Sequence, residues 1–143
     1  MKLSWTNLKI SIAGAKLSHL VQKDRIWDHG SMAEQARIIF YLAHKAKANE
    51  NFESLRKQCT ISCFEKIKNN SDGLGEQVVN PIVKEIAIID VLQGKNNKAD
   101  TFSALIKGVS RQDESDQFKT EWTFIRQGDW WLLDEIKNFK KAN

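Results

Sequence analysis

The sequence has only two cysteines, no long apolar run and no secretory leader pattern. No stretch approaches the roughly 18 consecutive apolar residues that a membrane-spanning helix needs. The first twenty residues interleave lysines with apolar residues, whereas a signal peptide has a continuous apolar core. So few cysteines argue against a disulfide framework and fit a reducing compartment. We therefore expect a cytoplasmic protein whose 143 residues are enough for one compact domain.

The motifs of metal and nucleotide sites are missing as well. Cys59 and Cys63 are four residues apart, so a helix would place them on one face, but no histidine lies nearby to complete a metal site. The sequence contains no P-loop, no G-x-G-x-x-G and no G-x-S-x-G motif. We expect no metal and no cofactor, and we interpret both cysteines as small core residues.

A mild excess of positive charge is present, with 22 basic and 18 acidic residues and a formal net charge of +4. Lys9, Lys16 and Lys23 recur at every seventh position, so a helix would align them in one basic stripe. Together with Arg25 they are the candidates for electrostatic contact with an anionic surface. The excess permits attraction to anionic membranes, ribosomal RNA or acidic proteins, but it requires none of them.

The pattern divides the chain into an N-terminal arm, residues 1–30, and a folded domain, residues 31–143. The arm fits three alternatives: an interfacial helix on anionic lipid, a helix packed on its own domain, or a partly disordered segment. From Ser31 the capping box S-M-A-E predicts a helix that runs to about Ala48. Apolar residues at helical spacing define its buried face: Met32, Ala36, Ile39, Phe40 and Ala43.

Two shorter helices are predicted next. The first carries Phe52 and Leu55. Thr60 caps the second, whose predicted buried residues are Ile61, Phe64 and Ile67. Residues 69–75 have the composition of a loop.

From Pro81 the period of the sequence changes from helical to extended. The run from Pro81 to Leu92 is rich in β-branched residues, and two further strands are predicted around Phe102 and Trp122. Gly128 and Asp129 predict a type II′ hairpin into the last strand. Helices followed by an antiparallel meander of about four strands predict an α+β domain, with N-terminal helices packed on one face of a curved sheet.

Three segments together resemble a known family. They are KLSHLVQKDRIWD, FYLAHKAKANENFESLRKQCTISCFEKI and EWTFIRQGDWWLLDEI. Over residues 16–137 the chain resembles the Tim44-like domain, the C-terminal domain of subunit forty-four of the mitochondrial inner-membrane translocase, and its bacterial relatives. The last segment carries the most specific motif, W-T-F-x-R, a turn, then W-x-L-D-x-I. Its positions are Trp122, Thr123, Phe124, Arg126, Trp131, Leu133, Asp134 and Ile136.

This resemblance implies a cone-shaped fold like that of nuclear transport factor two, with a hollow between a long helix and the curved sheet. It implies a non-catalytic binding or adaptor domain, peripheral to a membrane or a membrane-protein complex at the inner face of the membrane. Mitochondrial members tether a chaperone motor to a channel and touch anionic lipid, and a related member docks the ribosome. The implied partners are a protein or an acyl chain, an anionic membrane surface, and a second copy through the exposed face of the sheet.

The expected lining of the hollow is the best candidate for a ligand site: Tyr41, Trp122, Phe124, Trp131 and Asp134. The alternative function is a small isomerase or hydratase of the same fold that uses an inward aspartate, and Asp90 and Asp134 are the two candidates. Asp134 could equally pair with Arg126 across the hairpin. A nucleic-acid platform would need several cations beside the tryptophans, and the strand face of Trp122 offers only Arg126, so we expect no specific nucleic acid.

Overall fold

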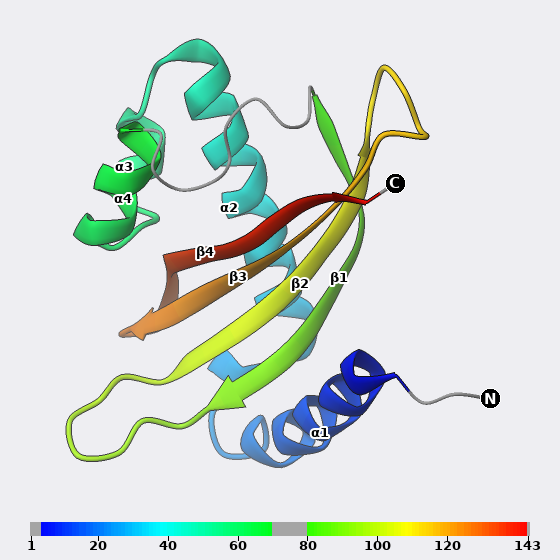
Figure 1. The fold of residues 1–143 in the computed structure, drawn as a ribbon. Helices are drawn as coiled ribbons and strands as arrows, with labels where there is room; N and C mark the ends of the chain where they lie inside the picture. The colour runs from blue at the N-terminus through cyan, green and yellow to red at the C-terminus, as the bar shows by residue number, and fades with distance from the viewer. Residues whose placement is uncertain (1–3, 70–79, 143) are drawn as a thin grey trace.

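The chain folds into helices packed on a curled, four-stranded antiparallel sheet, as the sequence predicts (Figure 1). The structure is a computed structural model, which describes residues 4–69 and 80–142, with side chains to residue 137. Its helices are α1 (Trp5–Leu20), the short 3-10 helix η1 (Arg25–Trp27), α2 (His29–Asn49), α3 (Glu53–Arg56) and α4 (Ile61–Lys68). Its strands are β1 (Pro81–Leu92), β2 (Thr101–Ser110), β3 (Gln117–Gln127) and β4 (Trp130–Ala142).

The strands pair in the order β1-β2-β3-β4, so each strand lies beside the next one in the sequence. Figure 1 shows α2 crossing one face of the sheet, α3 and α4 beyond the β4 edge, and α1 along β1. We call the face that packs on α2 the inner face and the opposite one the outer face. Of the loop predicted at residues 69–75, all but Asn69 lies outside the described residues.

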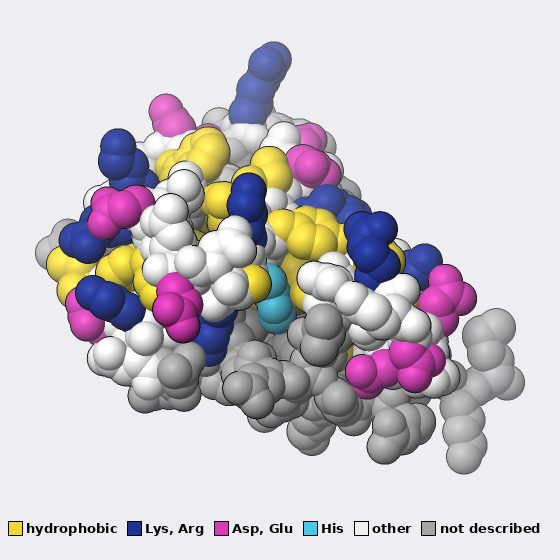
Figure 2. All heavy atoms as spheres, turned by 90° about the horizontal axis from the view of Figure 1, so that it is seen from above, with side chains coloured by type: hydrophobic (Ala, Val, Ile, Leu, Met, Phe, Trp, Pro, Cys, Tyr) yellow, Lys and Arg dark blue, Asp and Glu magenta, His cyan; other side chains and the backbone are white. Residues whose placement is uncertain are grey.

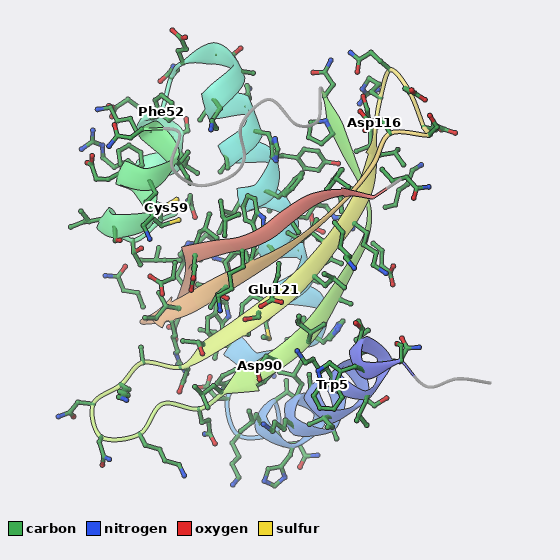
Figure 3. The ribbon with its side chains drawn as sticks, in the orientation of Figure 1. Trp5, Phe52, Cys59, Asp90, Asp116 and Glu121 are labelled. Carbon is green, nitrogen blue, oxygen red and sulfur yellow. The ribbon has the colours of Figure 1, made fainter. Side chains whose placement is uncertain are left out.

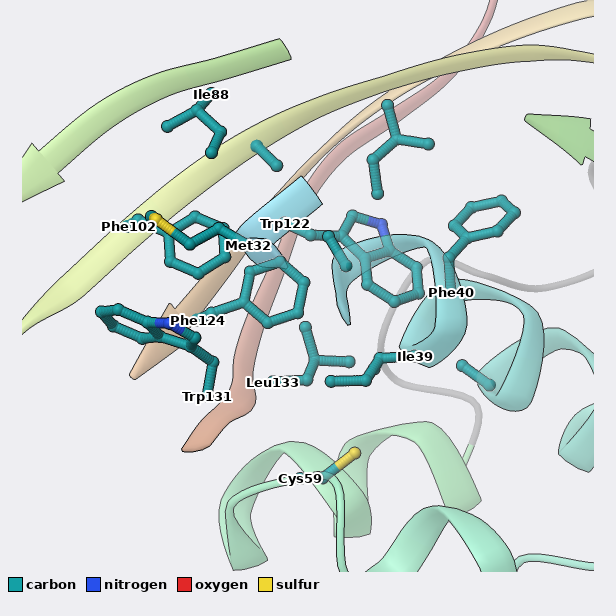
Figure 4. Close-up of a cluster of buried hydrophobic side chains, with 14 of the residues drawn as sticks. Met32, Ile39, Phe40, Cys59, Ile88, Phe102, Trp122, Phe124, Trp131 and Leu133 are labelled. Carbon is teal, nitrogen blue, oxygen red and sulfur yellow. The ribbon is translucent and has the colours of Figure 1, made fainter. Parts of the chain in front are cut away.

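The inner face of the sheet and one side of α2 form the core. All five residues predicted to form the buried side of α2 are inaccessible to solvent. Phe102, Trp122 and Phe124 alternate with outward residues on β2 and β3, and each is at most 1% exposed. Figure 4 shows how these rings, with Trp131, fill the space between the sheet and α2. The aromatic side chains of the last hairpin therefore fix the curled sheet onto α2.

Ring contacts join α2, η1 and the sheet in this core. The ring centroid of Phe40 on α2 lies 5.1 Å from that of Trp122 and 5.6 Å from that of Phe118. Trp131 on β4 contacts Phe102 on the sheet at 4.8 Å. Trp27, which precedes α2, packs edge-on against Trp131 at 5.1 Å. Most of these contacts are tilted or edge-to-face, so they stabilise the core beyond the effect of the buried area alone.

The start of α2 differs from the prediction. The helix begins at His29, and Asp28 is its N-cap, accepting a hydrogen bond from the backbone N–H of Ser31 at 2.9 Å. Ser31 is therefore inside the first turn, and the predicted capping box at Ser31 is wrong. An aspartate caps a helix as well as a serine does, and its charge also favours the positive helix end.

The region around α4 confirms one predicted cap and corrects one buried residue. Thr60 caps α4 by accepting from the backbone N–H of Cys63 at 3.3 Å, as predicted. Ile61, predicted to be buried, is 84% exposed because the buried side of α4 is formed by Cys63, Phe64 and Ile67. Cys59 lies before α4 rather than inside a helix, in a bridge to Leu133 of β4.

The N-terminal helix α1 packs on the sheet through a narrow contact. Ala13 and Leu17 are its buried residues, and both belong to the same core as Trp27 and α2. Of the three alternatives for the arm, the structure shows a helix packed on its own domain. Among the described helices, none is both long and apolar enough to cross a membrane.

Candidate functional site

One groove of the described residues lies where the start of α2 meets the β3–β4 turn. It has a volume of about 850 Å³, and we call it the hairpin groove. Its apolar lining consists of Ile26, Met32, Ile38, Ile39, Trp130 and Trp131. Most of these side chains support the groove from the core, but Ile38 is 51% exposed and Trp130 is 48% exposed. Two large apolar side chains thus face solvent in one concave surface.

Alternation along β4 explains why Trp130 is exposed. Trp131 and Leu133 point to the inner face and are buried, so Trp130, their neighbour across the pleat, points away. Gly128 has a φ of 63°, and the φ of Asp129 is not positive, as the predicted type II′ turn requires. The tight turn brings Trp130 to the very end of the hairpin, beside α2.

Three hydrogen bonds hold the walls of the groove together. Gln35 Nε2 on α2 donates to the carbonyl oxygen of Trp131 at 2.7 Å. Trp130 Nε1 donates to Gln58 Oε1 at 2.9 Å, and Trp131 Nε1 donates to the carbonyl oxygen of Ile26 at 3.3 Å. These bonds connect η1, α2, the α3–α4 segment and β4. The groove is therefore a preformed surface, and its indole N–H groups already have acceptors.

Arg126 lies next to the turn of the hairpin, beside the groove. Its guanidinium lies 2.8 Å from Asp24, 3.2 Å from Asp100 and 3.8 Å from Asp129, and its Nε donates to the carbonyl oxygen of Gly128. The hydrogen bond from Arg126, with a second one from the backbone N–H of Ile26, lowers the pKa of Asp24 below its ordinary value. Arg126 therefore pairs with these three residues, and not with Asp134.

The structure separates the residues predicted to line a hollow. Trp122 and Phe124 are fully buried and fill the space between α2 and the sheet. Tyr41 is 38% exposed, and its hydroxyl oxygen accepts from the backbone N–H of Val83 at 2.8 Å. Asp134 is half-buried at a register shift of β4. Only Trp131 lines the hairpin groove.

Asp90, the second aspartate predicted to face the interior, lies on the outer face and is exposed, so that prediction is wrong. A register shift between Ile88 and Asp90 inserts Ile89 into β1, and Asp90 then pairs with Ser103 rather than continuing the inward alternation of Ile88. Figure 3 shows Asp90 near the end of β1, next to α1. Among the described residues, no group of three or more His, Cys, Asp or Glu side chains could hold a metal ion.

The four basic residues predicted to form one surface lie in different places. Lys9 and Lys16 are on α1, where Lys9 Nζ lies 5.8 Å from the ring centroid of Trp5 and Lys16 Nζ donates to the carbonyl oxygen of Val91 at 3.4 Å. Lys23 is exposed in the turn after α1, and Arg25 lines the hairpin groove. On the end of the molecule shown in Figure 2, basic and acidic side chains alternate with apolar ones. This view is of the end opposite α1, and among the described residues on it the basic side chains form no continuous surface.

The hairpin groove is the feature that sequence reasoning missed. Ile38 falls on the otherwise polar side of α2, and Trp130 is the first of two adjacent tryptophans at the start of β4. Gln58 lies far from both in the sequence, between two short helices. A large apolar residue on the polar side of an amphipathic helix was the available signal. Comparison with protein-family models, curated proteins and solved structures gave no match.

Proposed function

We propose that the chain is a non-catalytic binding domain of the Tim44-like kind, and that its hairpin groove holds an apolar segment of a partner protein. The observation that carries the proposal is the exposure of Ile38 and Trp130 in one concave surface with a buried apolar floor. Exposed aromatic and aliphatic side chains grouped in a groove are typical of recognition sites. Tryptophan in particular contributes strongly to protein interfaces.

The hydrogen bonds between the walls of the groove support binding more than chemistry. Its polar side chains Gln35 and Gln58 already hold the walls in place through hydrogen bonds. Asp24 is paired with Arg126, and Asp28 caps α2. These groups have structural partners, so the groove offers a shaped apolar surface in which little has to be reordered on binding.

Site-directed photocrosslinking tests the proposal. Benzoylphenylalanine at position 38 of the full chain is illuminated in an extract of the source cells, and position 61 serves as the control because Ile61 is 84% exposed outside the groove. We expect one discrete protein adduct from position 38, its loss when Trp130 is replaced by alanine, and no such adduct from position 61.

Three results bear against this function. Equal labelling from positions 38 and 61 would show that adducts form by exposure alone. A position-38 adduct that survives Trp130→Ala would show that the groove is not the binding surface. An adduct whose added mass is that of a lipid would assign the groove to an acyl chain instead of a protein segment.

A further inference from the structure

Acidic side chains surround the apolar part of the hairpin groove. Among the described residues that line it, one basic side chain, Arg25, stands against four carboxylates: Asp24, Asp28, Glu34 and Asp129. The whole chain carries a formal net charge of +4, so this lining is opposite in sign to the protein as a whole. A concave surface lined mainly by charges of one sign attracts ligands of the opposite charge.

The carboxylates beside the β3–β4 turn are only partly neutralised. Arg126 is shared by three of them, Asp24, Asp100 and Asp129, so one guanidinium charge faces three carboxylate charges. It lies 2.8 Å from Asp24 but 3.8 Å from Asp129, whose side chain is fully exposed. Asp129 is therefore the most loosely held of the three, and its carboxylate can accept hydrogen bonds from a partner.

Two further carboxylates extend the acidic lining along the start of α2. Asp28 caps the helix, and hydrogen bonds from the backbone and the side chain of Ser31 lower its pKa, so it is ionised at neutral pH. Glu34, in the second turn, lies 3.6 Å from Arg37, but both side chains are largely exposed. Solvent and salt screen such a pair, so it leaves Glu34 available to a second cation.

On the basis of the binding function proposed for the groove, we infer that its partner is a cationic amphipathic segment. Large apolar side chains of the segment cover Ile38 and Trp130, and adjacent lysine or arginine side chains pair with the carboxylates of the lining. Apolar burial then supplies most of the affinity, whereas the charges select the partner and fix its orientation. An arginine suits Asp129 best, since a guanidinium binds a carboxylate through two parallel hydrogen bonds. The same lining disfavours nucleic acids and anionic lipid head groups, because their phosphates would meet carboxylates.

Fluorescence anisotropy with labelled synthetic peptides tests this assignment on the full chain. The first peptide alternates pairs of leucines with lysine, the second has glutamate in place of lysine, and the third has serine in place of leucine. We expect the leucine–lysine peptide to bind and the other two to bind at least about tenfold more weakly. Added salt should weaken binding of the leucine–lysine peptide, because exposed charges are screened.

A variant with a neutral lining tests where the charges act. Asp28→Asn, Glu34→Gln and Asp129→Asn together remove three carboxylate charges, and an asparagine at position 28 still caps α2. This variant should bind the leucine–lysine peptide about tenfold more weakly. The matched control removes three exposed carboxylates outside the groove and should bind like the wild type: Glu65→Gln, Glu85→Gln and Glu114→Gln. Circular dichroism checks that each variant is folded.

The possible results distinguish this assignment from the proposed function. Equal affinity for the leucine–lysine and leucine–glutamate peptides overturns the assignment, as does equal binding by the neutral-lining variant and its control. If Trp130→Ala abolishes binding in those cases, the groove still holds an apolar segment and its proposed function stands. Peptide binding that survives Trp130→Ala counts against both. Absence of any peptide binding overturns the assignment, and crosslinking from position 38 then decides the function separately.

Discussion

The guanidinium of Arg126, in the last hairpin, lies 2.8 Å from the carboxylate of Asp24, which precedes α2. Arg126 is 23% exposed and also holds Asp100 at 3.2 Å, at the start of β2. One side chain thus connects three segments that are far apart in the sequence. The side chain of Asp24 is 42% exposed, but that of Asp100 is only 21% exposed. Because the Arg126–Asp100 pair is partly shielded from solvent, its removal costs more than the loss of a surface ion pair.

Replacement of Arg126 by methionine should lower the free energy of unfolding by roughly 1–3 kcal/mol, because Asp24 and Asp100 lose their charge-assisted hydrogen bonds. Urea denaturation followed by circular dichroism measures the change. Asp129→Asn is the control, since Asp129 is fully exposed and 3.8 Å from Arg126; it should change stability by no more than about 0.5 kcal/mol. Equal effects of the two variants would contradict a shielded network.

The buried indole of Trp122 depends on one hydroxyl group. Trp122 Nε1 donates to Thr120 Oγ1 at 3.0 Å, and both residues are fully buried. Thr120→Val keeps the shape but leaves the indole N–H unpaired, which should cost about 1–3 kcal/mol of stability. In a Trp122→Phe background the same change should cost clearly less. A double-mutant cycle of unfolding free energies with no coupling would refute this dependence.

Two glycines should respond in opposite directions to alanine. A Cβ at Gly108 would collide with the carbonyl oxygen of Ile82 and lie 2.7 Å from the ring of Phe118, so Gly108→Ala should destabilise the protein by about 1–3 kcal/mol. A Cβ at Gly14, inside α1, meets nothing within 4 Å, so Gly14→Ala should stabilise it by about 0.5–1 kcal/mol. Thermal unfolding should show a lower melting temperature for Gly108→Ala and a higher one for Gly14→Ala. A stabilising Gly108→Ala would mean that β1 and β2 are further apart at this point.

His44 should make stability dependent on pH. Burial lowers its pKa from 6.5 to about 4, with a smaller contribution from the charge of Lys47. As the pH falls below 6.5 the unfolded chain takes up the proton first, so stability should decline between about pH 6.5 and pH 4, by up to about 3 kcal/mol. Urea denaturation between pH 7.5 and pH 5 should show the decline in the wild type and a flatter profile in His44→Gln. Parallel profiles would exclude His44 as its source.

The predicted and the observed N-cap of α2, Ser31 and Asp28, can be compared by mutation. Asp28→Ala removes the side chain that accepts from the N–H of Ser31 and should lower the free energy of unfolding. Ser31→Ala leaves that acceptor in place and should cost less. Urea denaturation of both variants compares the two positions directly. A larger loss from Ser31→Ala would restore the predicted capping box.

The periodic parts of the fold were predictable, and the parts made by local irregularities were not. Buried residues recur every three to four positions on α2 and every second position on β3. The spacing of apolar residues in the sequence shows both periods. Asp90 escaped prediction because Ile89 is an extra residue in β1, which reverses the alternation after it. Ile61 was misplaced because a helix of eight residues gives its periodicity little room.

The hairpin groove was out of reach for a different reason. Its walls come from η1, α2, the segment before α4 and the β3–β4 turn, which are brought together only by the tertiary fold. Ile38 and Trp130 carry no local pattern that connects them. The last hairpin, which carries the most specific motif of the predicted resemblance, supplies Arg126 and both tryptophans of the groove.

The distribution of the five tryptophans gives the molecule its own optical reporters. Trp27, Trp122 and Trp131 are shielded in the core, whereas Trp5 and Trp130 are hydrated and stand on separate surfaces. The native tryptophan fluorescence therefore combines short-wavelength emission from the core with longer-wavelength emission from Trp5 and Trp130. Replacement of either residue by phenylalanine removes its contribution. A Trp5→Phe chain would report occupancy of the groove, and a Trp130→Phe chain would report events at the first helix, without any added dye.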